Sequence, residues 1–125
     1  MEALILSITL FVLATFLGTD PINVGATPEQ KADWLGALAE HGHFYAYGAT
    51  EPQAGSEANN LKTRAVLKDG HWVLNGSKQF ITNSGTDITR FVTVTAVTGE
   101  SDGRKEISTI IVPSGTPGFT VEPGY

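Results

Sequence analysis

The first seventeen residues contain the longest apolar run of the chain. Between Ala3 and Leu17 no residue is charged, and three hydroxyl residues are the only polar ones. A membrane span needs roughly 20 apolar residues, and a secretory signal needs early positive charge, whereas the first basic residue here is Lys31. We therefore expect a helix that is buried on most sides by protein.

A second helix is predicted from Thr27 to about Glu40. Thr27 is a favourable N-cap, Pro28 suits the first helical position, and Gln30 stands three residues after the cap. The pair His41-Gly42 is typical of a helix end. Three apolar residues at helical spacing mark one face of this helix: Trp34, Leu35 and Leu38.

From Phe44 onward the hydrophobic pattern changes to short runs rich in aromatic, Val, Ile and Thr residues. Asp69-Gly70 and Asn75-Gly76 are typical of tight hairpin turns, and a further hairpin is expected across the polar loop 98–105. The expected strands are Lys62–Lys68, His71–Leu74, Ser77–Thr82, Ile88–Val97, Glu106–Pro113 and Phe119–Glu122. Two helices followed by these strands predict an α+β chain whose second part is an antiparallel β-sandwich or small barrel.

Composition excludes several classes of function. A length of 125 residues fits one ordinary domain. Eight basic residues, scattered singly, and thirteen acidic ones give a net charge of -5, which argues against nucleic acid as a partner. The absence of cysteine excludes a disulfide framework, a thiolate nucleophile and a cysteine-bound metal. His41 and His43 have only His71 as a further histidine, so no metal site is expected.

Two segments combine residue types that suit a nucleotide ligand. The stretch 47–56 joins a strand to a loop of small residues, hydroxyls and glycines, where backbone N–H groups and the Ser56 hydroxyl can approach a phosphate. In the second segment, Phe80 and Thr82 are expected on the same side of a strand end, as a planar heterocycle requires. Each segment also has an ordinary interpretation: a surface turn for the first, and a strand with a core phenylalanine for the second.

Taken together, these segments resemble the acyl-CoA dehydrogenases, flavoenzymes that desaturate acyl-CoA thioesters. The resemblance runs from about Gly25 to Glu122 and rests on several motifs in one order and spacing. The motifs are GATPEQK (25–31), TEPQAGS (50–56), NLKTRA (60–65), LNGSKQFITN (74–83) and IVP (111–113). Ala49 and Glu57 depart from the usual family pattern, and neither removes a group that touches flavin directly. Asn60 stands where a small residue is more usual.

The resemblance implies two parts: the end of an N-terminal helical domain in residues 1–41, and a truncated middle domain that binds flavin and acyl-CoA in residues 42–125. It implies FAD as the cofactor, with Thr50 near the pyrimidine edge and the Thr82 hydroxyl directed at N5, the atom that receives hydride. Ser56 would lie close to both the pyrophosphate and the acyl-CoA substrate. The implied cofactor-binding residues are Tyr47, Ala49, Thr50, Gly55, Ser56, Phe80, Ile81 and Thr82.

In the family reaction a carboxylate removes the α-proton of the thioester while hydride leaves the β-carbon for flavin N5, which gives a 2-enoyl-CoA. The family's base lies far toward the C-terminus, in a helical domain that this chain lacks, so no catalytic residue is assigned and the chain alone is expected to be inactive. Glu51, within a Thr-Glu-Pro turn, is interpreted as a structural anchor.

For the intact enzyme, the resemblance implies a homotetramer, electron-transfer flavoprotein as the electron acceptor and no membrane. It also implies a location in the bacterial cytoplasm or, in a eukaryote, the mitochondrial matrix. Acyl-CoA oxidases and flavin monooxygenases share the fold, and these residues do not distinguish them. From a different class of protein, a non-catalytic β-sandwich binding module behind a hydrophobic N-terminal anchor stays open, and flavin retention separates it from the others.

Overall fold

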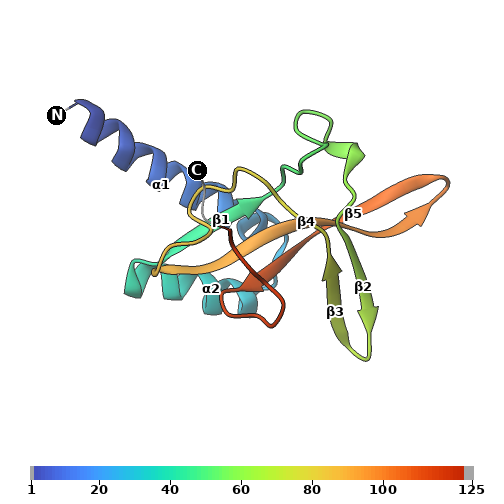
Figure 1. Ribbon diagram of the computed structural model, residues 1–125. Coiled ribbons are helices and arrows are strands. Elements are labelled where there is room, and N and C mark those ends of the chain that lie inside the picture. The colour runs from blue at the N-terminus through green and yellow to red at the C-terminus, as the bar shows by residue number, and fades with distance from the viewer. Residues whose placement is uncertain (1, 123–125) are drawn as a thin grey trace.

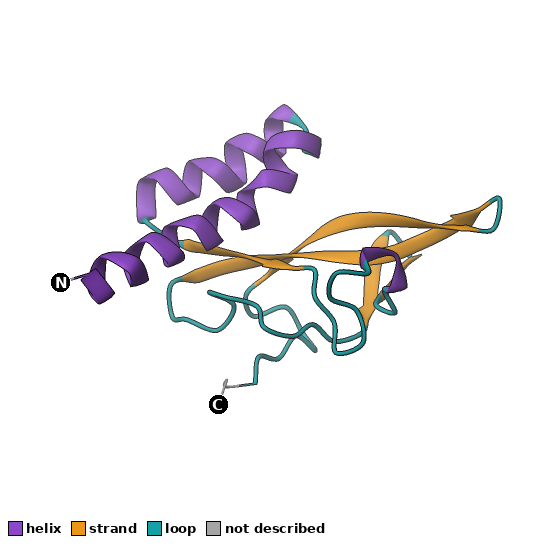
Figure 2. Cartoon of the chain, turned by 90° about the horizontal axis from the view of Figure 1, so that it is seen from above, coloured by secondary structure: helices purple, strands orange, loops and turns teal. Residues whose placement is uncertain are grey.

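A computed structural model of the chain describes the backbone of residues 2–122 and the side chains of residues 9, 12, 13 and 15–122. Two helices lie on one face of a five-stranded sheet, and loops lie on the other face (Figures 1 and 2). The helices are α1 (Glu2–Gly25) and α2 (Pro28–His41), and a short 3-10 turn, η1, spans Ala58–Asn60. The strands are β1 (Phe44–Gly48), β2 (Arg64–Lys68), β3 (His71–Asn75), β4 (Thr89–Ser101) and β5 (Arg104–Pro113).

Strand β4 is the centre of the sheet. It pairs in parallel with β1 and antiparallel with β5, and it meets β2 in parallel at one residue pair, Arg64 and Val97. The α+β class with two leading helices is confirmed, but the sheet is mixed and not wholly antiparallel. A parallel pair needs a crossover connection instead of a tight turn, and residues 49–88, which include the β2–β3 hairpin, form that connection between β1 and β4.

Helix α2 begins and ends where the sequence predicts. Thr27 accepts a hydrogen bond from the Gln30 backbone N–H, and the Gln30 side chain accepts one from the Thr27 N–H, which completes a capping box. Gly42 ends the helix in the left-handed conformation, at φ 63°. Both signals are local, which explains why they could be read from the sequence.

The aromatic core lies between the helices and the sheet. Tyr45 and Phe91 stack with ring centroids 3.8 Å apart, and Trp34 of α2 meets Phe91 edge to face at 5.1 Å. The Tyr45 hydroxyl donates to the Trp34 carbonyl, so the polar end of this buried ring is satisfied. Leu35 and Leu38 pack against the same cluster. The predicted apolar face of α2 is therefore confirmed.

The predicted N-terminal helix is confirmed as α1, but its burial is not. A stripe of mostly small residues faces the sheet: Thr15, Gly18, Thr19 and Ile22. Gly18 permits this approach, because a Cβ there would lie 2.7 Å from the Tyr45 carbonyl carbon. Four large apolar side chains are instead 48–57% exposed: Val12, Leu13, Phe16 and Leu17.

Most of the apolar run before Val12 lies outside the described side chains. Within the part of the chain that the structure describes, no helix has the length and apolar character of a membrane span.

The opposite face of the sheet is covered by irregular loops. Its buried cluster, which we call the valine cluster, consists of Ala46, Val92, Val94 and Val112. Leu74, Ile81 and Phe119 pack against this cluster. The expected strands at 77–82 and 119–122 are wrong, because both segments are loops. The expected turn at Asn75-Gly76 is also wrong. A Cβ at Gly76 would lie 2.3 Å from the Thr63 hydroxyl oxygen, so this glycine permits a close approach of two segments and does not reverse the chain.

Two tight turns join the antiparallel pairs. Asp69 and Gly70 have φ values of 50° and 78°, and Asp102 and Gly103 have values of 51° and 72°. Positive φ at both central residues is the geometry that suits a two-residue hairpin. The first turn is confirmed. The polar loop expected at 98–105 is reduced to its two central residues, because β4 and β5 continue on either side of them.

Candidate functional site

The two segments singled out from the sequence lie side by side. The Thr50 carbonyl, just after β1, accepts a hydrogen bond of 2.9 Å from the Gln79 backbone N–H, which follows β3. Residues 49–56 and 78–83, which we call the first and second site loops, therefore meet at the sheet edge where β1 ends. This contact brings together residues that are separated by the whole β2–β3 hairpin.

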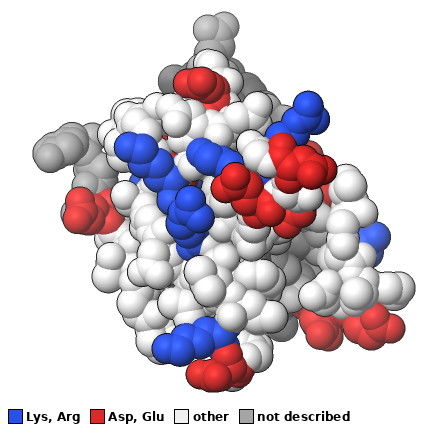
Figure 3. Space-filling model, turned by 90° about the vertical axis from the view of Figure 1, so that its right-hand side faces the viewer, with Lys and Arg blue, Asp and Glu red and all other residues white. Residues whose placement is uncertain are grey.

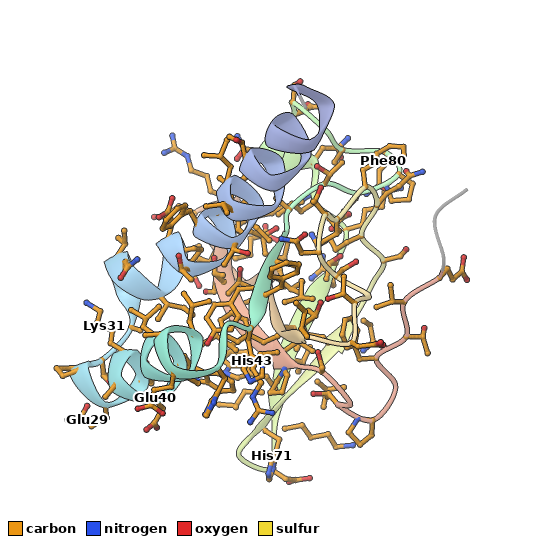
Figure 4. All side chains as sticks on the ribbon, turned by 90° about the vertical axis from the view of Figure 1, so that its left-hand side faces the viewer. Glu29, Lys31, Glu40, His43, His71 and Phe80 are labelled. Carbon is orange, nitrogen blue, oxygen red and sulfur yellow. The ribbon has the colours of Figure 1, made fainter. Side chains whose placement is uncertain are left out.

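The second site loop presents an aromatic ring to solvent. Phe80 is 85% exposed and has a φ of 59°. A left-handed conformation at a residue other than glycine costs about 1–3 kcal/mol and is concentrated at functional sites. Figure 4 shows Phe80 on the side of the molecule away from α2. The exposed ring of Phe80 therefore takes little part in the packing of this loop.

The neighbours of Phe80 fix the loop to the body of the protein. Ile81 points inward and packs on the valine cluster, while Thr82 is exposed. Asn83, at φ 68°, is buried and donates to the Thr15 hydroxyl of α1 at 3.3 Å. The Thr89 hydroxyl donates to the Asn83 carbonyl. Phe80 and Thr82 are thus exposed groups on an anchored loop, although the loop is not the strand end that the sequence predicted.

The first site loop is a compact turn with exposed small residues at its end. Glu51 and Ala54 exchange two backbone hydrogen bonds of 2.9 and 3.0 Å. Gly55 and Ser56 follow and are exposed, and a Cβ at Gly55 would meet no atom within 4 Å. The backbone around Gly55 is therefore exposed and uncrowded.

Glu51 is the buried centre of the first site loop. Its carboxylate accepts hydrogen bonds from the backbone N–H groups of Lys62 and Thr63, at 2.8 and 3.0 Å. The Lys78 ammonium lies 2.8 Å away and also donates to the Ala49 carbonyl. Burial raises the pKa of Glu51, but the Lys78 ammonium and the backbone donors lower it more, to about 2. These contacts support the interpretation of Glu51 as a structural anchor.

Not all the expected residues are brought together. Tyr47 of β1 pairs with Thr93 of β4, and the Thr93 hydroxyl donates to the Gly18 carbonyl of α1. Strand alternation therefore places Tyr47 on the face that carries the helices, whereas Ile81 packs on the opposite face. Ala49 contacts the second site loop through its carbonyl, which accepts a hydrogen bond from the Lys78 ammonium.

Sequence reasoning missed Lys78. It is the only charged residue between Asp69 and Asp87, as Glu51 is between Glu40 and Glu57, if histidines are taken as neutral. Two isolated opposite charges, each within an otherwise uncharged motif, were the available signal for this pair.

The described residues also have features away from the two site loops. Among the side chains that the structure describes, no group of three or more His, Asp or Glu residues comes together in a way that could hold a metal ion. On the face drawn in Figure 3, acidic and basic side chains are interspersed. A groove of about 690 Å³ lies between the helices and β4 and β5, and none of the expected flavin residues lines it.

Known proteins match this chain in sequence and fold. A sequence model of the acyl-CoA dehydrogenase middle domain matches residues 46–125. An acyl-CoA dehydrogenase of Bacillus subtilis (strain 168) is 46% identical over 108 residues, which are 86% of this chain and 28% of that protein.

Two solved structures are similar in fold. Butyryl-CoA dehydrogenase from Megasphaera elsdenii has a TM-score of 0.79 and 40% identity, over 89% of this chain and 29% of that one. An acyl-CoA dehydrogenase from Bacillus anthracis, complexed with FAD, has a TM-score of 0.73 and 38% identity, over 86% of this chain and 18% of that one. The chain spans less than a third of the length of these relatives. The family match over most of its residues shows that it belongs to the acyl-CoA dehydrogenase family.

Proposed function

We propose that this chain is a flavin- and acyl-CoA-binding part of an acyl-CoA dehydrogenase, which oxidises acyl-CoA to 2-enoyl-CoA with FAD as the hydride acceptor. The observation that carries the proposal is the contact between the two site loops, one of which holds Phe80 exposed in a strained conformation. A planar ring bound at this edge would cover the exposed aromatic side chain and meet hydroxyls from both loops.

The residues present fit FAD. Phe80 would lie along the ring system, the Thr82 hydroxyl would face N5, and Thr50 would face the pyrimidine edge. The open backbone at Gly55 and the exposed Ser56 hydroxyl would meet the pyrophosphate and the substrate. When bound, the flavin supplies a two-electron acceptor, and hydrogen bonds from these groups tune its potential.

We propose that no residue of the two site loops acts as the general base. Their one carboxylate, Glu51, is buried against Lys78 and has a pKa of about 2. A base with so low a pKa drives proton abstraction poorly near neutral pH. We expect the chain alone to bind FAD and acyl-CoA without turning over any acyl-CoA, as measured with an artificial electron acceptor.

For the whole protein we propose an electron-transfer flavoprotein as the acceptor of the flavin electrons and a homotetramer as the assembly. Both proposals rest on membership of the family, which the match to its middle domain supports. Co-purification with an electron-transfer flavoprotein and the mass of the assembly in solution would test them separately.

The binding proposal is tested by titrating the purified chain with FAD and following flavin fluorescence and absorption. Saturable binding to the unchanged chain is expected. Thr82→Val should weaken it about 2- to 13-fold, because one hydrogen bond contributes about 0.5–1.5 kcal/mol. Thr109→Val, at an exposed threonine of β5, is the matched control and should leave the Kd unchanged. Absence of saturable binding to the unchanged chain would contradict the proposal.

A further inference from the structure

A buried ion pair links the two site loops directly. The Glu51 and Lys78 side chains are only 2% and 10% exposed, and their charged atoms are 2.8 Å apart. Glu51 follows Thr50 in the chain, and Lys78 lies two residues before Phe80. Among the described residues, Lys78 is the only cationic side chain within 4.0 Å of the Glu51 carboxylate.

Each member of the pair is also tied to other parts of the fold. The Glu51 carboxylate accepts from the two backbone N–H groups that precede β2 and from the Gln53 side chain. Lys78 donates to the Ala49 carbonyl and, at 3.2 Å, to the Thr95 hydroxyl of the central strand β4. The pair therefore fixes both site loops to β4 and to the start of β2 as one unit.

This degree of burial separates the pair from ordinary surface ion pairs. Exposed pairs contribute little to stability, because water screens them and the side chains lose entropy. Removing one partner of a buried pair leaves an uncompensated charge, which strongly destabilises its surroundings. Replacing both partners by well-packed hydrophobic residues of similar volume avoids that penalty and often leaves stability unchanged or raises it.

We propose that Glu51 and Lys78 are positioning residues for the flavin: they hold the first and second site loops in register before the cofactor binds. The inference rests on the proposed function, since it concerns the same two loops. Neither residue touches the flavin in this account. Both act through the groups next to them in the chain, which are Thr50 on one side and Phe80 to Thr82 on the other.

The test measures FAD affinity and thermal stability side by side for Lys78→Met, for the double variant Glu51→Gln/Lys78→Met, and for Lys105→Met as a control. Lys105 also holds the connection between β1 and β2, through the Asn59 and Leu61 carbonyls at 3.2 and 2.9 Å, but it is exposed and does not contact the second site loop. We expect Lys78→Met to lose both stability and affinity, and Lys105→Met to keep its Kd.

The double variant decides the matter. It should regain part of the melting temperature, because no unpaired charge remains, although the amide of Glu51→Gln accepts from only one of the two backbone N–H groups. It should still bind FAD about 10–100-fold more weakly, the range known for residues that orient the ligands of metal sites. Recovery of both quantities would show a merely structural pair and overturn the inference, as would equal affinity in all variants. If the unchanged chain does not bind FAD, the proposed function fails and the inference fails with it. The titration of the unchanged chain distinguishes the two failures.

Discussion

The two faces of the sheet are built in different ways. On the helix face, α1 and α2 pack a stripe of small residues and an aromatic cluster against β1 and β4. On the loop face, irregular segments cover a small valine cluster and contain both a buried ion pair and residues at positive φ. The first face is organised for stability, and the second holds polar groups and strain that stability alone does not require. Functional groups commonly lie on loops that a rigid scaffold positions.

The largest effect is expected from Phe91→Ala on the helix face. Phe91 is fully buried and contacts both Tyr45 and Trp34. Removing a buried aromatic ring costs about 3–5 kcal/mol, which is a large part of the stability of a small domain. Urea unfolding of the variant should show this loss. A change below about 1 kcal/mol would mean that this cluster is not the core.

The next largest effect is the pH dependence of stability that comes from Glu51 on the loop face. The pKa of Glu51 falls from 4.5 to about 2 on folding, so its ionisation stabilises the fold by about 3 kcal/mol at pH 7. This contribution is fully present above pH 4.5 and is lost as the pH falls through 2. The free energy of unfolding, measured in urea at several pH values, should therefore fall more steeply toward acid for the unchanged chain than for Glu51→Gln. Parallel pH profiles would contradict this account of the carboxylate.

A smaller effect is expected where the helix and the sheet approach most closely. Gly18→Ala places a methyl group 2.7 Å from the Tyr45 backbone, so α1 must shift away from β1. Overpacking of this kind costs about 1–3 kcal/mol. Gly36→Ala in α2, where a Cβ meets no atom within 4 Å, is the control and should preserve or slightly raise the melting temperature. Equal behaviour of the two variants would argue against the close packing of α1.

The smallest effect on stability separates the two faces most clearly. Phe80→Gly removes an exposed ring and relieves its positive φ, so stability should stay the same or rise by about 1 kcal/mol. FAD affinity should nevertheless fall, because the ring no longer packs on the flavin. Thermal unfolding and an FAD titration of the same samples test this. A variant that loses stability and keeps its affinity would reverse the roles assigned to the two faces.

Sequence reasoning succeeded where the signals are local. The capping box of Thr27 and Gln30 and the turn at Asp69-Gly70 specify their own geometry within a few residues. The burial of α1 could not be read, because its apolar run contains no charged residue that marks the outer side. The structure buries Thr15 and Gly18 and exposes larger apolar side chains.

The failures on the loop face have a common physical cause. The sequence predicted a turn at Gly76. Glycine is needed there because the chain passes close to Thr63, and such a contact between separate segments cannot be predicted from the local sequence. The parallel pairing of β1 with β4 and the partnership of Glu51 with Lys78 are likewise set by tertiary contacts. The motifs of the two site loops were visible in the sequence, whereas the contact that joins them was not.

The central claim is that the two site loops together bind one flavin. Amide hydrogen exchange of the chain, with and without FAD, measures this claim most directly, because it locates protection along the sequence. The account predicts that FAD slows exchange in residues 49–56 and 78–83 together and leaves α2 unchanged. Protection confined to one loop, or centred on the groove between the helices and the sheet, would contradict it.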